Sequence, residues 1–230
     1  FAGLFGLLET MSLEQRTQTL RIFAPEAEQF VSAIEDFGYS SKPFKILPVN
    51  VEYIGHDVEV LVDEEEYQIV AMPADHGVPA VAYAFVEKDR VKIDKDKAAA
   101  LGLPAKGPLY NKLKQSGFVI FKDKKIKLED LSVVEKGKRI VYSGDTRPCQ
   151  NVLQLSMNAN LLIHDSTYFE EFERKHATFK DVLQIAKEAG VKSVVLTHIS
   201  RRYQDESKLK ELVEKFPSVK IARDFMKIVV

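Results

Sequence analysis

The stretch Arg139-Ile140-Val141-Tyr142-Ser143-Gly144-Asp145 joins a short apolar run to a glycine and a carboxylate. An apolar run of this length that ends at glycine predicts a buried β-strand. An apolar run followed by polar residues recurs in Leu161-Leu162-Ile163-His164-Asp165 and in Ser193-Val194-Val195-Leu196-Thr197-His198. Polar side chains of the kind that bind metals therefore follow three predicted strands, each at its carboxyl end.

Working outward from these strands, the chain alternates between strand-like and helix-like spacing. Residues 178–189 have the apolar periodicity of a helix that ends at Gly190, and residues 208–216 predict a second helix. Nearer the N-terminus, helices are expected within 1–21 and over 26–37, the latter ending at Gly38. Further strands are expected at residues 20–23, 44–54, 58–62, 68–73, 80–87, 220–222 and 227–230. This alternation predicts a layered α/β architecture.

The composition restricts the classes of function. The chain has 230 residues, and its 33 Lys/Arg nearly cancel its 34 Asp/Glu, for a net charge of −1. Such a balance argues against attraction of the whole surface to nucleic acid or to a membrane. No apolar run approaches the roughly 20 residues that span a bilayer. The single cysteine, Cys149, excludes an internal disulfide framework and fits a reducing cytoplasm.

Residues 88–127 differ from the rest of the chain in charge. They contain 12 Lys/Arg and 4 Asp/Glu, a local net charge of +8. We expect a basic, loop-rich and poorly packed arm that stands off an acidic body. A solvated lysine-rich face is the alternative that charge alone leaves open. A single long helix is not expected, because the segment is interrupted at Gly102, Pro104, Gly107, Pro108 and Gly117.

The residues after the predicted strands suit a zinc site. Side chains at the carboxyl ends of neighbouring strands meet in one crevice, and zinc accepts imidazole nitrogen and carboxylate oxygen. Asp145, His198 and His76 are the candidates, although any single histidine could equally be a hydrogen-bonded structural residue. We expect His164 to pack near the site and His56, in Gly55-His56-Asp57, to be a turn residue at a hairpin tip.

Several stretches resemble the ribonuclease Z family. Tyr142–Cys149 resembles the Ser-Gly-Asp-Thr motif of that family, and His164-Asp165-Ser166-Thr167 resembles its His-Glu-Ala-Thr box, with Asp in place of Glu. The likeness continues in His176-Ala177-Thr178, in Thr197–Tyr203, in Asp75–Pro79 followed by Ala82-Tyr83, and in Gly102–Tyr110, which is similar to the Gly-Pro segment of the family's tRNA-gripping arm. The motifs together are specific, and the resemblance runs along the whole chain.

The resemblance implies a metallo-β-lactamase four-layer αβ/βα sandwich over residues 1–230, with residues 88–127 as an inserted, flexible, tRNA-binding arm. It implies two zinc ions per complete subunit, with His76, Asp145 and His198 as ligands and with His176, oriented by Asp165, as the catalytic proton donor. The family's His-x-His-x-Asp-His motif is not in the sequence. The chain is therefore expected to be truncated at its N-terminus, to bind zinc poorly and to be inactive alone.

The activity that the resemblance implies is removal of the 3′ trailer from precursor tRNA, by hydrolysis after the discriminator nucleotide, leaving a tRNA 3′-hydroxyl. It further implies a cytoplasmic homodimer without a membrane partner. Two other functions stay open: another phosphodiesterase or sulfatase of the same fold, and a non-catalytic RNA-binding fragment. The residues expected to contact the RNA are Lys106, Gly107, Pro108, Lys112, Lys114 and Arg201.

Overall fold

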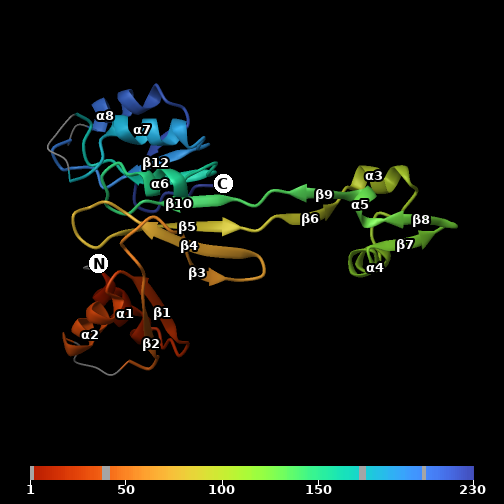
Figure 1. Cartoon of the computed structure of the whole chain (residues 1–230), viewed down its shortest axis with the longest axis horizontal. Helices are drawn as coiled ribbons and strands as arrows, with labels where there is room; N and C mark the ends of the chain where they lie inside the picture. Colours follow the sequence, from red (N-terminus) through yellow and green to blue (C-terminus); the bar gives the residue numbers. More distant parts are fainter. Residues whose placement is uncertain (1–2, 38–41, 171–174, 204–205) are drawn as a thin grey trace. The chain divides into compact units, whose positions relative to one another are not determined.

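The computed structural model describes residues 3–37, 42–170, 175–203 and 206–230 (Figure 1). The chain forms two compact units. The first, called the core unit below, comprises Phe1–Val86 and Lys138–Val230, and the second, called the inserted unit, comprises Glu87–Gly137. Gly38, the expected end of the second helix, lies outside the described residues.

A seven-stranded sheet organises the core unit, in the order β13-β12-β11-β10-β5-β4-β3. Strands β10 to β13 are parallel to one another, whereas β10 is antiparallel to β5. The parallel strands therefore end at one edge of the sheet. The bounds are β3 (Glu59–Asp63), β4 (Tyr67–Pro73), β5 (Val81–Glu87), β10 (Arg139–Tyr142), β11 (Leu161–Asp165), β12 (Val194–Thr197) and β13 (Val219–Ile221).

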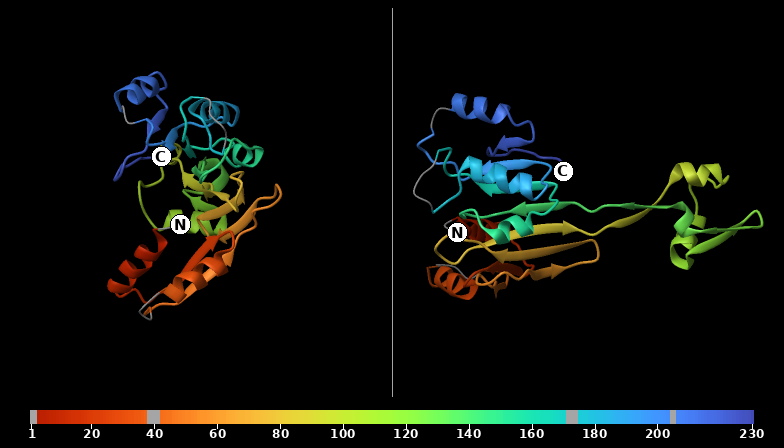
Figure 2. Two further views of the ribbon diagram at one scale, coloured as in Figure 1. Left: turned by 90° about the vertical axis from the view of Figure 1, so that its left-hand side faces the viewer. Right: turned by 45° about the horizontal axis from the view of Figure 1, so that its top comes forward.

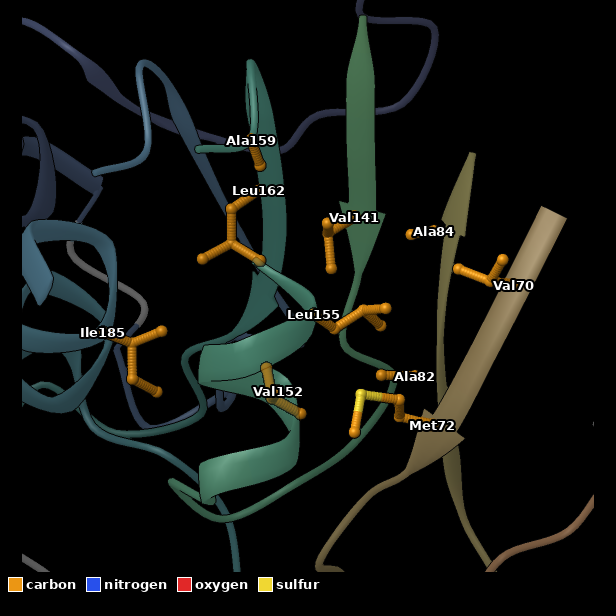
Figure 3. Close-up of a cluster of buried hydrophobic side chains, with 10 residues drawn as sticks. All are labelled: Val70, Met72, Ala82, Ala84, Val141, Val152, Leu155, Ala159, Leu162 and Ile185. Atoms are coloured by element: carbon orange, nitrogen blue, oxygen red, sulfur yellow. The ribbon is translucent and has the colours of Figure 1, made fainter. Parts of the chain in front are cut away.

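Helices cover one face of this sheet, namely α6 (Gln150–Leu155), α7 (Phe179–Glu188) and α8 (Glu206–Glu214). Helix α7 begins at the expected place because Thr178 and Asp181 form a capping box there. Figure 3 shows how the apolar side chains of α6 and α7 meet those of the strands. This cluster comprises Val70, Met72, Ala82, Ala84, Val141, Val152, Leu155, Ala159, Leu162 and Ile185.

A second, smaller layer covers the opposite face of the sheet (Figure 2). It consists of the parallel pair β1 (Leu20–Ala24) and β2 (Ile46–Asn50), backed by α1 (Leu4–Leu13) and α2 (Ala27–Phe37). Strand β5 contributes side chains to the apolar clusters on both faces of the sheet, because alternate side chains of a strand point in opposite directions. Its Tyr83 donates a hydrogen bond to the Phe23 carbonyl at 2.8 Å, and burial raises the pKa of Tyr83 to about 12. Helix, sheet, sheet and helix thus form the expected four-layer sandwich.

The inserted unit has a hydrophobic core of its own, so the expectation of a poorly packed, loop-rich arm is wrong. Ala98, Leu103, Leu113, Val119, Ile126 and Leu131 are buried together in it. Gly102 and Gly117 do not interrupt the structure. Both have positive φ; Gly117 is the C-cap of its helix, and Gly102 directly follows the C-cap residue Leu101. Its elements are β6 (Arg90–Ile93), α3 (Lys95–Ala100), α4 (Leu109–Ser116), β7 (Phe118–Phe121), β8 (Lys124–Lys127), α5 (Leu128–Leu131) and β9 (Ser132–Glu135).

Two further expectations are corrected. Residues 227–230 do not form a strand; Phe225 and Val229 are almost fully exposed, and within the described residues β13 is the last strand on that side of the sheet. His56 lies in a bend, as expected, but the strands on either side of it belong to different sheets, so it is not at a hairpin tip. Within the described residues, none of the helices combines the length and the apolar composition that a membrane-spanning helix needs.

Leu162→Ala tests whether the cluster of Figure 3 stabilises the core unit. Leu162 is fully buried in that cluster, so removing three side-chain carbons leaves a cavity between β11 and the helices. We expect the free energy of unfolding to fall by about 2–5 kcal/mol in urea titrations. Leu13→Ala is the matched control because Leu13 is 83% exposed, and it should change stability little. Equal effects of the two substitutions would show that this cluster does not specifically stabilise the core unit.

Candidate active site

Three neighbouring parallel strands deliver polar side chains to one edge of the large sheet. β10 is followed by Ser143, Gly144 and Asp145, β11 ends at Asp165, and β12 is followed by His198. Gly144 has a φ of +62°, and a Cβ atom there would lie 3.2 Å from the Val81 carbonyl, so the turn into Asp145 favours glycine. His198 also has a positive φ, +58°, which is uncommon outside glycine and often accompanies functional sites.

The fully buried carboxylate of Asp165 lies at the centre of this edge. Its Oδ1 accepts hydrogen bonds from the backbone N–H of Thr167 at 2.9 Å and from the Thr167 hydroxyl at 2.6 Å. Its Oδ2 accepts from the backbone N–H of Thr146 at 3.1 Å and from Nδ1 of His176 at 2.7 Å. Four donors thus compensate the loss of water around a buried charge. The Asp165–His176 pair expected from the sequence is present, although Asp replaces the longer Glu.

Two of the candidate metal ligands, His76 and His198, lie next to His176. The His176 ring lies 4.9 Å from the His198 ring and 4.7 Å from the His76 ring, measured between centroids. Nε2 of His198 lies 3.4 Å from Oδ2 of Asp145. Both of these side chains are about two-fifths exposed, so this part of the site is open to solvent. The structure therefore brings His76, Asp145, Asp165, His176 and His198 into one group; their roles stay predictions.

The chemistry of the donors indicates which members of this group could hold a metal. Among the described residues, the candidate ligand atoms of Asp165, His176 and His198 lie within 4.8 Å of one another. A carboxylate offers about four lone-pair directions, and those of Asp165 are already used by four hydrogen-bond donors. We therefore regard Asp145, which is partly exposed beside Nε2 of His198, as the better carboxylate ligand. Imidazole nitrogen with carboxylate oxygen is a donor set that fits zinc.

Contacts between the loop that carries His76 and the loop that carries Asp145 hold His76 in place. The Arg147 guanidinium forms an ion pair with the Asp75 carboxylate, and the Arg147 backbone N–H donates to the Asp75 carbonyl at 2.7 Å. The Asp75 N–H donates to the Thr146 hydroxyl at 3.2 Å. The loop that carries His76 is thereby fixed to the loop that carries Asp145. The sequence alone indicated no role for Arg147 or Thr146, although both lie inside the motif that follows β10.

The remaining candidates have other surroundings. Nδ1 of His56 is hydrogen-bonded to Asn151 at 2.8 Å, and Cys149 is half-buried with its sulfur 3.9 Å from the Thr146 hydroxyl. Arg201 is exposed and lines a cavity of about 310 Å³ with Ile199 and Tyr203. The other expected RNA contacts are all exposed in the inserted unit: Lys106, Gly107, Pro108, Lys112 and Lys114.

The pKa values of two side chains near the strand ends, Tyr142 and His164, are shifted by burial and by neighbouring groups. Burial raises the pKa of Tyr142, and the negative charges of Asp145 and Asp165 raise it further. Burial lowers the pKa of His164, which is completely buried as expected and bonds through Nδ1 to the Asp165 carbonyl at 2.7 Å. Among the described residues, Nε2 of His164 has no hydrogen-bond partner, so a second ring proton would be buried without an acceptor. His164 is therefore a neutral packing residue.

Comparisons with known proteins show what the chain is similar to in sequence and in fold. The model of the Beta-lactamase superfamily domain matches residues 112–199. The chain is 39% identical to "Ribonuclease Z" of Archaeoglobus fulgidus, covering 99% of this chain and 76% of that protein. It is 37% identical to "Ribonuclease Z" of Methanosarcina acetivorans, with the same two coverages. The crystal structure of human tRNase Z, short form, is similar in fold, with a TM-score of 0.59 at 22% identity over 100% of this chain and 74% of that one.

The lowered pKa of His164 predicts how stability depends on pH. The unfolded state takes up a proton at this residue below the ordinary histidine pKa of about 6.5, whereas the folded state does so only at lower pH. The folded state is therefore fully stabilised above that pH and loses stability as the pH falls below it, by at most about 1.4 kcal/mol per pH unit. In His164→Gln, the free energy of unfolding should fall less between about pH 7.5 and 5.5 than in the wild type.

The exposed His56 offers the matched control. His56→Gln should retain the wild-type dependence of unfolding free energy on pH, measured by urea titration at each pH. If His164→Gln and the wild type lose stability in parallel, His164 is not held neutral by burial.

Proposed function

The chain belongs to the ribonuclease Z family, and we propose that it is a zinc-dependent endoribonuclease that removes the 3′ trailer from precursor tRNA. The family is one of hydrolytic endoribonucleases with the metallo-β-lactamase fold. The observation that carries the proposal is the hydrogen bond between buried Asp165 and His176, next to the Asp145–His198 pair. A proton donor and candidate metal ligands are then adjacent, an arrangement that suits metal-assisted hydrolysis of a phosphodiester.

His76, Asp145 and His198 would hold zinc, which when bound would supply a nucleophilic water at neutral pH and positive charge opposite the phosphate. His176 has the complementary task. Its Nδ1 proton is committed to Asp165, so Nε2 is the nitrogen that exchanges a proton with substrate. Cleavage after the discriminator nucleotide, leaving a 3′-hydroxyl, requires a proton on the departing 3′ oxygen. His176, in its protonated form, would donate that proton from Nε2.

The inserted unit would position the RNA. It contains 13 Lys/Arg and 8 Asp/Glu, a net charge of +5, whereas the rest of the chain has a net charge of −6. Lys106 precedes the Gly107-Pro108 turn, and Lys112 and Lys114 follow on α4, all of them exposed. Exposed lysines at such a turn suit contact with phosphates of a folded RNA, which proteins recognise by shape and backbone. Arg201 of the core unit would contact the RNA near His198.

Other parts of the proposal follow from family membership alone. We propose that the protein acts as a homodimer in the cytoplasm. The expectations that the chain of 230 residues is inactive by itself and binds zinc poorly stay predictions. The experiments below distinguish this proposal from two competing functions, a phosphodiesterase for small substrates and a non-catalytic RNA-binding fragment.

His176→Ala tests the proton donor. In the full-length protein with precursor tRNA, we expect kcat to fall about 10²–10⁴-fold while KM and binding of uncleaved RNA change little, because a general acid acts in the transition state. His56→Ala is the matched control, since His56 is exposed and hydrogen-bonded to Asn151 rather than to the catalytic group. A loss confined to RNA affinity would make His176 a binding residue instead.

A charge-matched pair of triple variants tests the inserted unit. Replacing Lys106, Lys112 and Lys114 with Ala should weaken binding of precursor tRNA. It should also flatten the dependence of binding on salt, by about 0.7–0.9 in the logarithmic slope for each phosphate that a lysine no longer neutralises. Hydrolysis of bis-p-nitrophenyl phosphate should be retained, because a small phosphodiester needs only the core unit. The control variant replaces Lys180, Lys187 and Lys192, which are exposed lysines of the core unit, and removes the same charge.

Deleting the inserted unit extends this test. Val86 pairs with Arg139 across β5 and β10, so a short glycine turn in place of residues 87–137 would close that pair as a hairpin. Cleavage of precursor tRNA should disappear and small-substrate hydrolysis should persist. Equal effects of the two lysine variants on RNA, or retention of RNA cleavage after the deletion, would refute the role of the inserted unit. Absence of both activities in the full-length wild type would favour a non-catalytic RNA-binding protein.

A further inference from the structure

Thr167 lies between the two halves of the proposed site. Its hydroxyl oxygen is 2.6 Å from Oδ1 of Asp165 and 2.7 Å from Nδ1 of His198. Thr167 itself is buried, at 6% exposure, and its backbone N–H also donates to Asp165. We infer that Thr167 is a positioning residue that fixes the neutral ring of His198 in one tautomer, with its proton on Nδ1 and its lone pair on Nε2.

The inference follows from counting protons. A hydroxyl has one proton to donate and two lone pairs to accept with. Asp165 in its charged form only accepts, so the hydroxyl proton of Thr167 points to Oδ1. Toward His198 the same oxygen can then only accept. Nδ1 of His198 therefore carries the proton of that hydrogen bond, and in the neutral ring Nε2 carries none.

The alternative orientation of the hydroxyl is unfavourable. If Thr167 donated to Nδ1 of His198, its oxygen would face Oδ1 of Asp165 at 2.6 Å with no proton between two acceptors. Asp165 has no exposed surface, so water could not replace the missing donor. A buried acceptor without its donor costs about 1–3 kcal/mol, and more when it is charged. The network therefore favours one arrangement of protons.

This arrangement prepares His198 for the role proposed above. Its Nε2, the nitrogen left without a proton, is the atom that lies 3.4 Å from Asp145. A metal-binding histidine needs an unprotonated nitrogen, and the partner of its other nitrogen determines which one that is. The hydroxyl of Thr167 also bonds to the carboxylate that orients His176. One side chain thus aligns the candidate proton donor and a candidate metal ligand.

The first measurement uses the wild-type protein without metal. Long-range proton–nitrogen NMR correlations of protein labelled with ¹⁵N-histidine distinguish the two neutral tautomers, at a pH above the ordinary histidine pKa of about 6.5. We expect His198 to carry its proton on Nδ1. A proton on Nε2 of His198, or an even mixture of tautomers, would overturn the inference whatever the variants show.

Variants then test whether Thr167 causes the preference. Thr167→Val keeps the shape but removes the hydroxyl, and it should give His198 mixed tautomers. Thr167→Ser keeps the hydroxyl and should retain the Nδ1 proton, which also separates the inference from a simple packing effect. Thr197→Val is the matched control, because the neighbouring Thr197 hydroxyl has no hydrogen-bond partner among the described residues. An unchanged tautomer in folded Thr167→Val would refute the role of Thr167.

Cobalt provides the readout for the part that rests on the proposed function. Titration of the full-length protein with Co²⁺ alone, followed by visible absorption, should show affinity about 10–100-fold lower in Thr167→Val than in the wild type, Thr167→Ser or Thr197→Val. Equal affinities would exclude an effect of Thr167 on the metal ligand. Neither measurement uses RNA, so failure to cleave tRNA would leave the inference standing. Absence of Co²⁺ binding in the wild type would refute the proposed metal site, and the tautomer would still decide the inference.

Discussion

The buried carboxylate of Asp165 is the constraint on which the site depends. A charge without exposed surface is stable only when donors replace its water, and here they come from three separate segments. Thr146 belongs to the turn after β10, Thr167 follows β11, and His176 precedes α7. Satisfying one carboxylate therefore fixes the relative positions of three loops. The geometry of the candidate catalytic group is a consequence of that requirement.

The layers of the core unit make such a network possible. Parallel strands β10, β11 and β12 end at one edge of the sheet, and apolar clusters under α6 and α7 hold them there. Rigid strands position side chains more accurately than free loops do. Polar loops then add the remaining connections, among them the Arg147–Asp75 ion pair that ties the His76 loop to the turn after β10. Apolar packing thus fixes the strands, and the hydrogen bonds fix the positions of the loops that follow them.

The inserted unit follows a different principle. Its strand pairs and short helices bury six apolar side chains together, which is a small core for 51 residues, while the lysines of the proposed RNA surface stay exposed. The glycines that suggested interruption in the sequence end its helices instead. In the proposed function, a basic surface on an independently packed unit would separate RNA binding from bond cleavage. The two tasks can therefore be altered by different substitutions.

The sequence by itself determined most strands and the main helices of the core unit, and the polar residues that follow the strands. Apolar periodicity depends on local burial, and the parallel order of the strands then brings Asp145, Asp165 and His198 to one edge. Only the tertiary structure decided the short helix α6, the packing of the inserted unit and the absence of a strand at 227–230. It alone also revealed the hydrogen bonds of Thr167. These bonds reach residues up to 31 positions away, and their existence depends on angles and distances in space that no local pattern encodes.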